Sequence, residues 1–142
     1  MDELRTAAIQ VACMNLVARY GQLADQREHQ AFSEVFAPEG EWIRPGMHMR
    51  GREEIFRFME SRPARALTRH VCGSIAIDVA DEDHARGLSY TTVYRESDYG
   101  GSGTARLVQP EMVVDYRDTF VRIDGRWHIA SRHTTVVFSD KA

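Results

Sequence analysis

The hydrophobic period of this chain changes once, near Thr68, and this change limits the folds that the chain can adopt. Before Thr68, apolar residues recur every three or four positions, as in amphipathic helices. After Thr68, apolar and polar residues alternate, as in strands that bury one face. Helices followed by a run of strands favour an α+β domain, with the helices packed on one face of a mainly antiparallel sheet.

Three helices are predicted in the first half. The first covers residues 3–24, with Asp2 as its N-cap. A second, short helix ends before Pro38, and a third covers residues 52–60, with a brief strand over residues 41–44 between them. The apolar stripe of the first helix is predicted to comprise Leu4, Ala8, Val11, Ala12, Leu16, Tyr20, Leu23 and Ala24.

Four strands are predicted in the second half, over residues 68–80, 84–97, 105–123 and 126–138. Asp124-Gly125 indicates a two-residue hairpin between the last two strands. Because Pro110 has no N–H to donate, the third strand is expected to start after Pro110 or to carry a bulge there.

Length and composition exclude several classes of protein. The 142 residues fit one domain over residues 1–142, and a net charge of −3 without a basic stripe argues against nucleic-acid binding. The apolar runs are far shorter than the roughly 20 residues that span a bilayer, so no membrane association is expected. Met1-Asp2-Glu3 does not begin a signal peptide, and a cytoplasmic location is expected.

No metal or other cofactor is expected. The two cysteines, Cys13 and Cys72, are far apart in the sequence, and no pair of histidines has the spacing of a metal site. Both cysteines are interpreted as small apolar residues of the core.

Asp25 and His70 are the residues that point most directly to chemistry. Asp25 ends the first helix and His70 starts the first long strand. A carboxylate and an imidazole that meet in an apolar cavity form a general acid/base unit that works near neutral pH. Alternatively, Asp25-Gln26-Arg27-Glu28 fits a capping box for the second helix, a feature worth about 1 kcal/mol. The two roles do not exclude each other.

The strand that contains His70 has two unlike faces. One face is small and mixed, as expected of the wall of a ligand cavity, and comprises His70, Cys72, Ser74 and Ala76. The other is bulky and apolar, and comprises Val71, Ile75 and Ile77. The bulky face is expected to lie under another element or a partner subunit, which favours a homodimer or homotrimer. If the sheet curves, its concave face and the helices enclose an apolar pocket.

Tyr20 lies on the apolar stripe of the first helix, so core packing alone would explain it. A buried hydroxyl would still need a partner. On an ideal helix, five residues rotate by about 140°, so Tyr20 and Asp25 share a face only if Asp25 lies past the end of the helix.

Five motifs occur in a consistent order along the chain: Tyr20 with Asp25, residues 32–42, residues 51–55, Thr68-Arg69-His70, and residues 124–129. With these motifs the chain resembles, over nearly its whole length, the SnoaL-like branch of the NTF2-like superfamily. The resemblance implies a cone-shaped α+β barrel.

The resemblance also implies a reaction. The positions of Asp25 and His70 are similar to those of the catalytic Asp and His of scytalone dehydratase and related lyases. Tyr20 falls where steroid isomerases carry an oxyanion-hole Tyr. The implied activity is that of a cofactor-independent lyase, a dehydratase of a small hydrophobic cyclic molecule. The isomerase base would fall near Arg44, and a second dehydratase His near Tyr94 or Arg95, so these parts of the relatives' sites are not matched.

Further candidates for substrate contact lie on the strands. Related enzymes use a basic residue of the last strand, where Arg132 and His133 point to opposite faces, and parity along that strand favours His133. Tyr90 and Tyr94 share one face of the second long strand, and Tyr116 lies on the third. All three tyrosines are also ordinary sheet residues.

Two other functions are compatible with the resemblance. One is a non-catalytic domain that binds a small ligand. The other is the small subunit of a ring-hydroxylating dioxygenase, which would have no activity alone and would copurify with a larger iron-containing partner.

Overall fold

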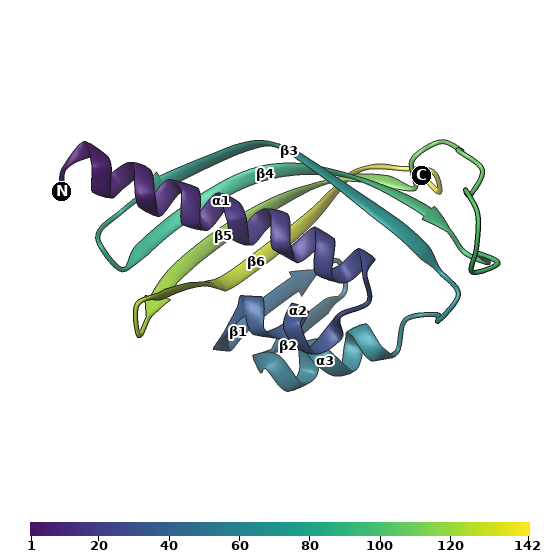
Figure 1. The fold of residues 1–142 in the computed structure, drawn as a ribbon, viewed down its shortest axis with the longest axis horizontal. Coiled ribbons are helices and arrows are strands. Elements are labelled where there is room, and N and C mark those ends of the chain that lie inside the picture. Colours follow the sequence, from purple (N-terminus) through teal and green to yellow (C-terminus); the bar gives the residue numbers. More distant parts are fainter.

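The computed structural model describes residues 1–142 as three helices packed on a curved, unclosed sheet of six strands (Figure 1). The helices are α1 (Glu3–Asp25), α2 (His29–Val35) and α3 (Gly51–Glu60). The strands are β1 (Phe36–Arg44), β2 (Met47–Arg50), β3 (Leu67–Val79), β4 (His84–Glu96), β5 (Met112–Ile123) and β6 (Arg126–Ser139). The predicted α+β arrangement is confirmed.

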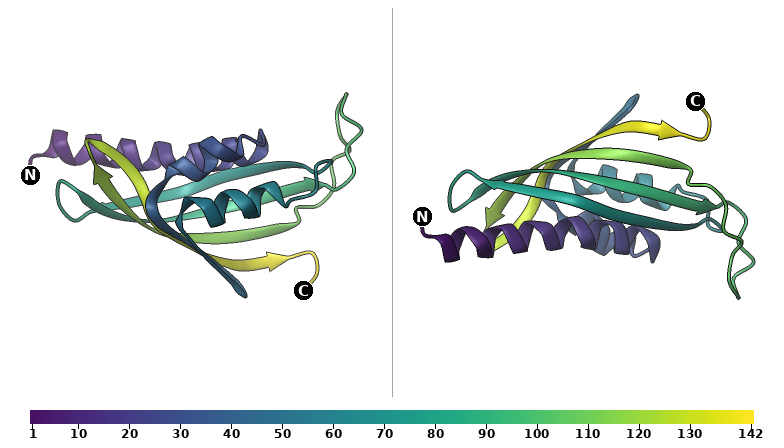
Figure 2. Two further views of the ribbon diagram at one scale, coloured as in Figure 1. Left: turned by 90° about the horizontal axis from the view of Figure 1, so that it is seen from below. Right: turned by 90° about the horizontal axis from the view of Figure 1, so that it is seen from above.

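The order of the strands in the sheet is β2-β1-β6-β5-β4-β3. All neighbours are antiparallel except β1 and β6, which run parallel. The long helix α1 runs along β3, while α2 and α3 pack together near β1, as the perpendicular views also show (Figure 2). The space between the end of α1, the short helices and the inner face of the sheet holds the cavity described below. None of the three helices is both long enough and apolar enough to cross a membrane.

The first half of the chain contains more strand than the sequence predicted. Strand β1 begins at Phe36, and an irregularity in its pairing with β6 before Glu41 leaves Pro38 out of the regular ladder. The predicted break at Pro45-Gly46 is a hairpin turn, with Gly46 at a φ of +72°, and it leads into the unpredicted strand β2. Pro110 precedes β5, as expected.

Helix α1 buries the predicted stripe only toward its C-terminal end, where Tyr20 and Ala24 are buried, and Asp2 caps the helix as expected. Leu4 and Val11 are 84% and 66% exposed, so their placement in the core was wrong. Residues spaced by four from Ile9 form a continuous buried stripe. The helix turns this row toward the sheet rather than the row that starts at Leu4. The buried residues of α1 are Ile9, Cys13, Val17, Tyr20, Gly21 and Ala24.

Strand β3 contains a bulge that the predicted alternation did not include. Gly73 pairs with Tyr90 and Ala76 with Leu88, so β3 has one residue more than β4 in this interval. Ser74 takes up the extra residue with a φ of +49°. The faces of the strand therefore exchange at this point.

As a consequence, Ile75 and Ile77 pack against the core, and only Val71 of the three residues of the bulky face is exposed. The prediction that Val71, Ile75 and Ile77 share one face of the strand, opposite to that of His70, was therefore wrong, although Ile75 and Ile77 do lie under other elements. A homo-oligomer remains a prediction, although this strand exposes less apolar surface than the prediction assumed.

The hairpin between β5 and β6 agrees with its prediction. Ile123 pairs with Arg126, and the two residues between them, Asp124 and Gly125, have φ values of +51° and +78°. Two successive left-handed residues are the requirement of a type I′ turn, which Asp-Gly meets at low cost.

Candidate functional site

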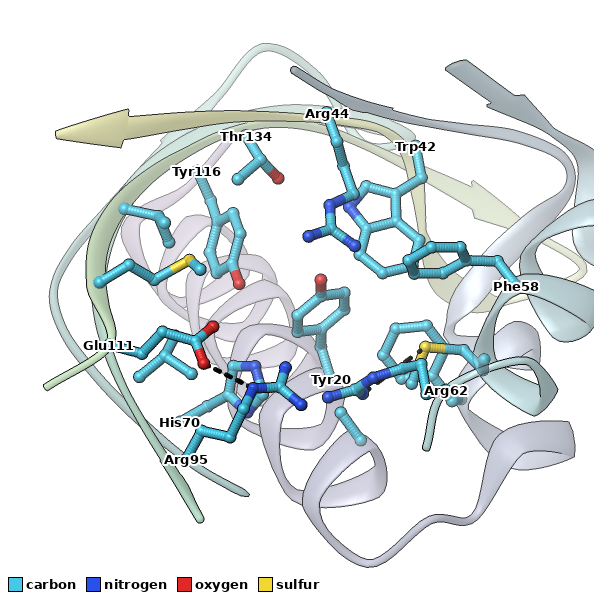
Figure 3. A pocket seen from close by; sticks show the side chains of 16 residues that line it. Tyr20, Trp42, Arg44, Phe58, Arg62, His70, Arg95, Glu111, Tyr116 and Thr134 are labelled. Carbon is cyan, nitrogen blue, oxygen red and sulfur yellow. Dashed lines mark hydrogen bonds and ion pairs between the residues drawn. The ribbon is translucent and has the colours of Figure 1, made fainter. Parts of the chain in front are cut away.

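A cavity of about 80 Å³ lies between the C-terminal end of α1, the short helices and the inner face of the sheet (Figure 3). Ten of its 16 lining side chains are hydrophobic. The polar lining residues are Arg44, Arg62, His70, Arg95, Glu111 and Thr134. The cavity therefore combines hydrophobic side chains with several charged and hydrogen-bonding groups that converge on it, as is typical of sites for small molecules.

Asp25 and His70 meet at the wall of this cavity. Oδ1 of Asp25 lies 2.6 Å from Nδ1 of His70, and Oδ2 accepts the backbone N–H of His70 at 2.9 Å. Thr68 donates its hydroxyl to Oδ1 at 2.9 Å. Because an ionised carboxylate only accepts hydrogen bonds, Nδ1 carries the proton, and Nε2, which has no protein partner, is free to accept one.

The charge of Asp25 is stabilised by these contacts. Burial acts to raise the pKa of the Asp25 carboxyl, but the hydrogen bonds and charge of His70, with the Thr68 hydroxyl, lower it further than burial raises it. The net effect is a pKa below the ordinary value, so the carboxylate stays ionised beside the imidazole at neutral pH.

Asp25 does not cap the second helix. The N-cap of α2 is Glu28, which makes no capping bond with its side chain, and both oxygens of Asp25 bond to β3. Arg27, with a φ of +58°, turns the chain sharply between the two helices. The capping-box prediction was therefore wrong, and the contact with His70 is the one that Asp25 makes.

Tyr20 also lies beside His70. Its ring lies edge-on to the imidazole, with 6.4 Å between the ring centroids, and its hydroxyl points into the cavity beside that of Tyr116 (Figure 3). Asp25 is the last residue of α1, and both Asp25 and Tyr20 lie beside His70, so the two need not share a helix face. Tyr20 also packs in the core against Phe32, with 4.7 Å between the ring centroids. Its ring therefore belongs to the core while its hydroxyl belongs to the cavity.

Both phenols remain protonated at neutral pH. Burial raises the pKa of Tyr20, and the charge of Arg132 offsets only part of this. Burial, with the neighbouring Tyr20, raises the pKa of Tyr116 well above its ordinary value. Each hydroxyl can therefore donate a hydrogen bond to an oxygen in the cavity.

Arg132 holds these two tyrosines from behind. Its guanidinium carbon lies 4.1 Å from the ring centroid of Tyr20 and 3.9 Å from that of Tyr116. The same group makes a fully buried, two-pronged ion pair with Asp118, with distances of 2.7 and 2.8 Å. Arg132 thus supports the wall of the cavity rather than lining it.

His133 is exposed, so the preference for His133 over Arg132 as the inward residue was wrong. Phe120 pairs with Ile129 and Thr119 with Ser131, which places one extra residue in β6 at this point. This bulge exchanges the inner and outer positions between Ile129 and Arg132. Regular alternation from Ile129 therefore assigns the wrong face to His133.

Tyr90 and Tyr94 were also placed wrongly as contacts for substrate. Tyr90 is 47% exposed, and neither tyrosine lines the cavity. The alternate positions of β4 point inward, and they include Val93 and Arg95, both of which line the cavity. Tyr116 lines the cavity, as the sequence indicated.

A profile of the SnoaL-like domain matches residues 5–133. The chain belongs to the SnoaL-like family. No curated protein sequence matches the chain. The family and the fold place the protein in the NTF2-like superfamily, which includes enzymes such as scytalone dehydratase and LinA.

Three solved structures illustrate the likeness. An NTF2-like protein with a cystatin-like fold from Novosphingobium aromaticivorans has a TM-score of 0.78 and 24% identity, over 98% of this chain and 87% of that one. A candidate scytalone dehydratase from the same organism has a TM-score of 0.82 and 19% identity, over 97% and 90%. LinA has a TM-score of 0.80 and 17% identity, over 97% and 92%. At such identities these likenesses show the fold.

Four charged residues of this SnoaL-like cavity were not predicted as site residues: Arg44, Arg62, Arg95 and Glu111. Arg95 donates through Nε to Glu111 at 2.6 Å. The alternation of side chains along a strand could have indicated two of the four, because Arg44 shares a face of β1 with Trp42 and Arg95 shares a face of β4 with Val93. Arg62 follows the end of α3, where no periodic signal exists.

Proposed function

We propose that this SnoaL-like protein is a cofactor-independent lyase, a dehydratase of a small hydrophobic cyclic molecule, in which His70 is the catalytic base. The observation that carries the proposal is the 2.6 Å hydrogen bond between Asp25 and Nδ1 of His70, which leaves Nε2 free at the wall of the cavity. The likeness in fold to a candidate scytalone dehydratase supports it.

In the first step, Nε2 of His70 accepts a proton from a carbon next to a carbonyl group of the substrate. The C–H electron pair moves into the carbonyl and forms an enolate. Asp25 stabilises the imidazolium that results, and general base catalysis of this kind is worth about 10²–10⁴ in rate.

The hydroxyls of Tyr20 and Tyr116 stabilise the enolate. Both point into the cavity and remain protonated, so both can donate to the oxygen that gains charge (Figure 3). Removal of one such donor typically costs about 10²–10³ in rate. Arg132 acts as a positioning residue, because it stacks on both rings without lining the cavity.

In the second step, the enolate re-forms its carbonyl and expels the hydroxyl group from the β carbon. The imidazolium returns its proton from Nε2 to this hydroxyl, which leaves as water. One C–H and one C–O bond are broken and one C=C bond is formed, so no redox cofactor is required.

The test is a panel of cyclic β-hydroxy ketones, with and without a carboxylate group, incubated with the protein in D₂O and followed by proton NMR. The proposal predicts olefinic signals, and deuterium at the α carbon of the remaining substrate. His70→Gln should lose both signals while it keeps its fold by circular dichroism.

A folded His70→Gln variant with wild-type turnover would contradict the proposal. Compounds that bind but neither react nor exchange deuterium would favour a non-catalytic binding domain instead. Activity that appears only after copurification with an iron-containing partner would favour the role of a dioxygenase subunit.

A further inference from the structure

The charges around the cavity do not balance. Three guanidinium groups line it, Arg44 from the end of β1, Arg62 from the residues after α3 and Arg95 from the end of β4, and Glu111 is the only carboxylate among the lining residues (Figure 3). The wall therefore carries two net positive charges when His70 is neutral. Positive charge concentrated in a small cavity attracts anions.

Two of the three guanidinium groups have no acidic partner. Glu111 pairs with Arg95. Arg44 makes no ion pair or hydrogen bond through its side chain, and its guanidinium carbon lies 5.2 Å from the ring centroid of Trp42 and 5.0 Å from that of Phe58. Stacking of this kind orients a guanidinium group and leaves its N–H edge free to donate.

Arg62 is in a similar state. The only hydrogen bond of its guanidinium group is a weak one, from Nη1 to the sulfur of Met59 at 3.9 Å. Burial lowers the pKa of Arg62, and the like charge of Arg95 lowers it further. An anion in the cavity would relieve this repulsion.

Buried polar groups without partners supply an independent sign of a ligand. Nε1 of Trp42 and Oγ1 of Thr134 are buried and have no hydrogen-bond partner, and both residues line the cavity. In native proteins, nearly all buried polar groups have a partner. Donors left free on the wall of a cavity suit a ligand with several oxygen atoms.

We infer that the cavity binds a small cyclic carboxylate, whose carboxylate group is held by Arg44 and Arg62 while its ring faces His70 and Tyr20. The inference names the substrate class of the proposed lyase, and it rests on that proposal for the reaction but not for the binding. A guanidinium group matches a carboxylate in shape and can form two parallel hydrogen bonds with it.

The test is isothermal titration of the protein with benzoate and with benzamide, which has nearly the same shape but no charge. Benzoate is expected to bind about tenfold more tightly than benzamide, since loss of one charge-assisted hydrogen bond costs about this factor. Its affinity is expected to fall as sodium chloride is added, because salt screens partly exposed charges.

Variants assign the effect to the named residues. Arg44→Met and Arg62→Met should each weaken benzoate about tenfold and leave benzamide unchanged. Arg19→Met, on the exposed side of α1, is the matched control and should change neither affinity. Thermal unfolding checks each fold, and Arg44→Gln and Arg62→Gln serve where a Met variant does not fold.

Equal affinities for benzoate and benzamide in the wild type would overturn the inference. So would wild-type affinity for benzoate in a folded variant that lacks both Arg44 and Arg62. The substrate panel separates this inference from the proposed function. If only uncharged ketones react, the lyase stands and the inference fails; if carboxylates bind without reacting, the inference stands and the lyase fails.

Discussion

Gly21 of α1 lies so close to β3 that a Cβ atom at this position would stand 3.2 Å from the Cβ of His70. A glycine within a helix costs about 1 kcal/mol relative to alanine, so its place in α1 needs a reason in packing. The absent side chain at Gly21 provides the space in which the imidazole lies, and so it sets the distance between the helix and the strand that bear Asp25 and His70.

Gly21→Ala should therefore impair the site more than the fold. The added methyl group must displace His70 by a few tenths of an ångström, whereas the gain in helix propensity offsets part of the packing cost. We expect turnover in the NMR assay to fall at least about tenfold, since small misplacements of a catalytic group are costly. The free energy of unfolding in urea should change by less than about 2 kcal/mol.

Gln22→Ala, at the next and exposed position of α1, is the control and should leave both quantities unchanged. Gly21→Ala with wild-type turnover would show that the position of His70 tolerates displacement.

Asp25→Asn should lower turnover by about 10²–10⁴. The amide keeps the shape of the side chain but cannot stabilise an imidazolium, and it can donate to Nδ1 and so favour the wrong tautomer. The downfield NMR resonance of the Nδ1 proton of His70 should also disappear. Persistence of this resonance in a folded variant would mean that Asp25 does not hold the proton.

Asp25 should also affect how the free energy of unfolding falls at acidic pH. Its pKa is lower in the folded protein than the ordinary value of 3.8, so its contribution to stability is fully present above that value. The contribution is lost as the pH falls through the lower, folded pKa. Urea unfolding from pH 5 downward should show a shallower loss of stability for Asp25→Asn than for the wild type. Parallel curves would contradict the assigned direction of the pKa shift.

Asp118→Asn should destabilise the protein by about 3–5 kcal/mol, because it leaves the buried charge of Arg132 without a partner. The double variant Arg132→Met/Asp118→Leu should recover much of this loss, since it removes both charges. Asp83→Asn breaks the more exposed pair with Arg122 and should cost less than about 1 kcal/mol. Denaturant unfolding measures all three, and equal costs for the two single variants would contradict the difference in burial.

Most elements of this fold could be predicted from the sequence, because helical and strand periods are local properties. The direction of individual side chains could not be predicted where a bulge interrupts a strand. The extra residues at Ser74 and near Ala130 reverse the alternation that follows them; Gly73 stands beside the first bulge, but no glycine lies beside the second. This is why His133 was favoured over Arg132.

The contact between Asp25 and His70 could be expected only from the resemblance to known lyases. It depends on how α1 packs on β3, which the periodicity of either element does not determine. Arg62 escaped prediction for a related reason, since it lies outside any regular element and enters the cavity through tertiary structure alone.

The bulge at Ser74 allows one strand to meet two demands that conflict. In a regular strand, residues five positions apart face opposite sides, so without the bulge a strand that turned His70 inward would turn Ile75 and Ile77 toward solvent, and one that buried the isoleucines would expel the imidazole. The spacing between His70 and Ile75 is therefore a constraint in its own right. Regular pairing of the present sequence would expel one of the two from the interior, whereas deletion of the extra residue would give a regular strand that keeps both inside.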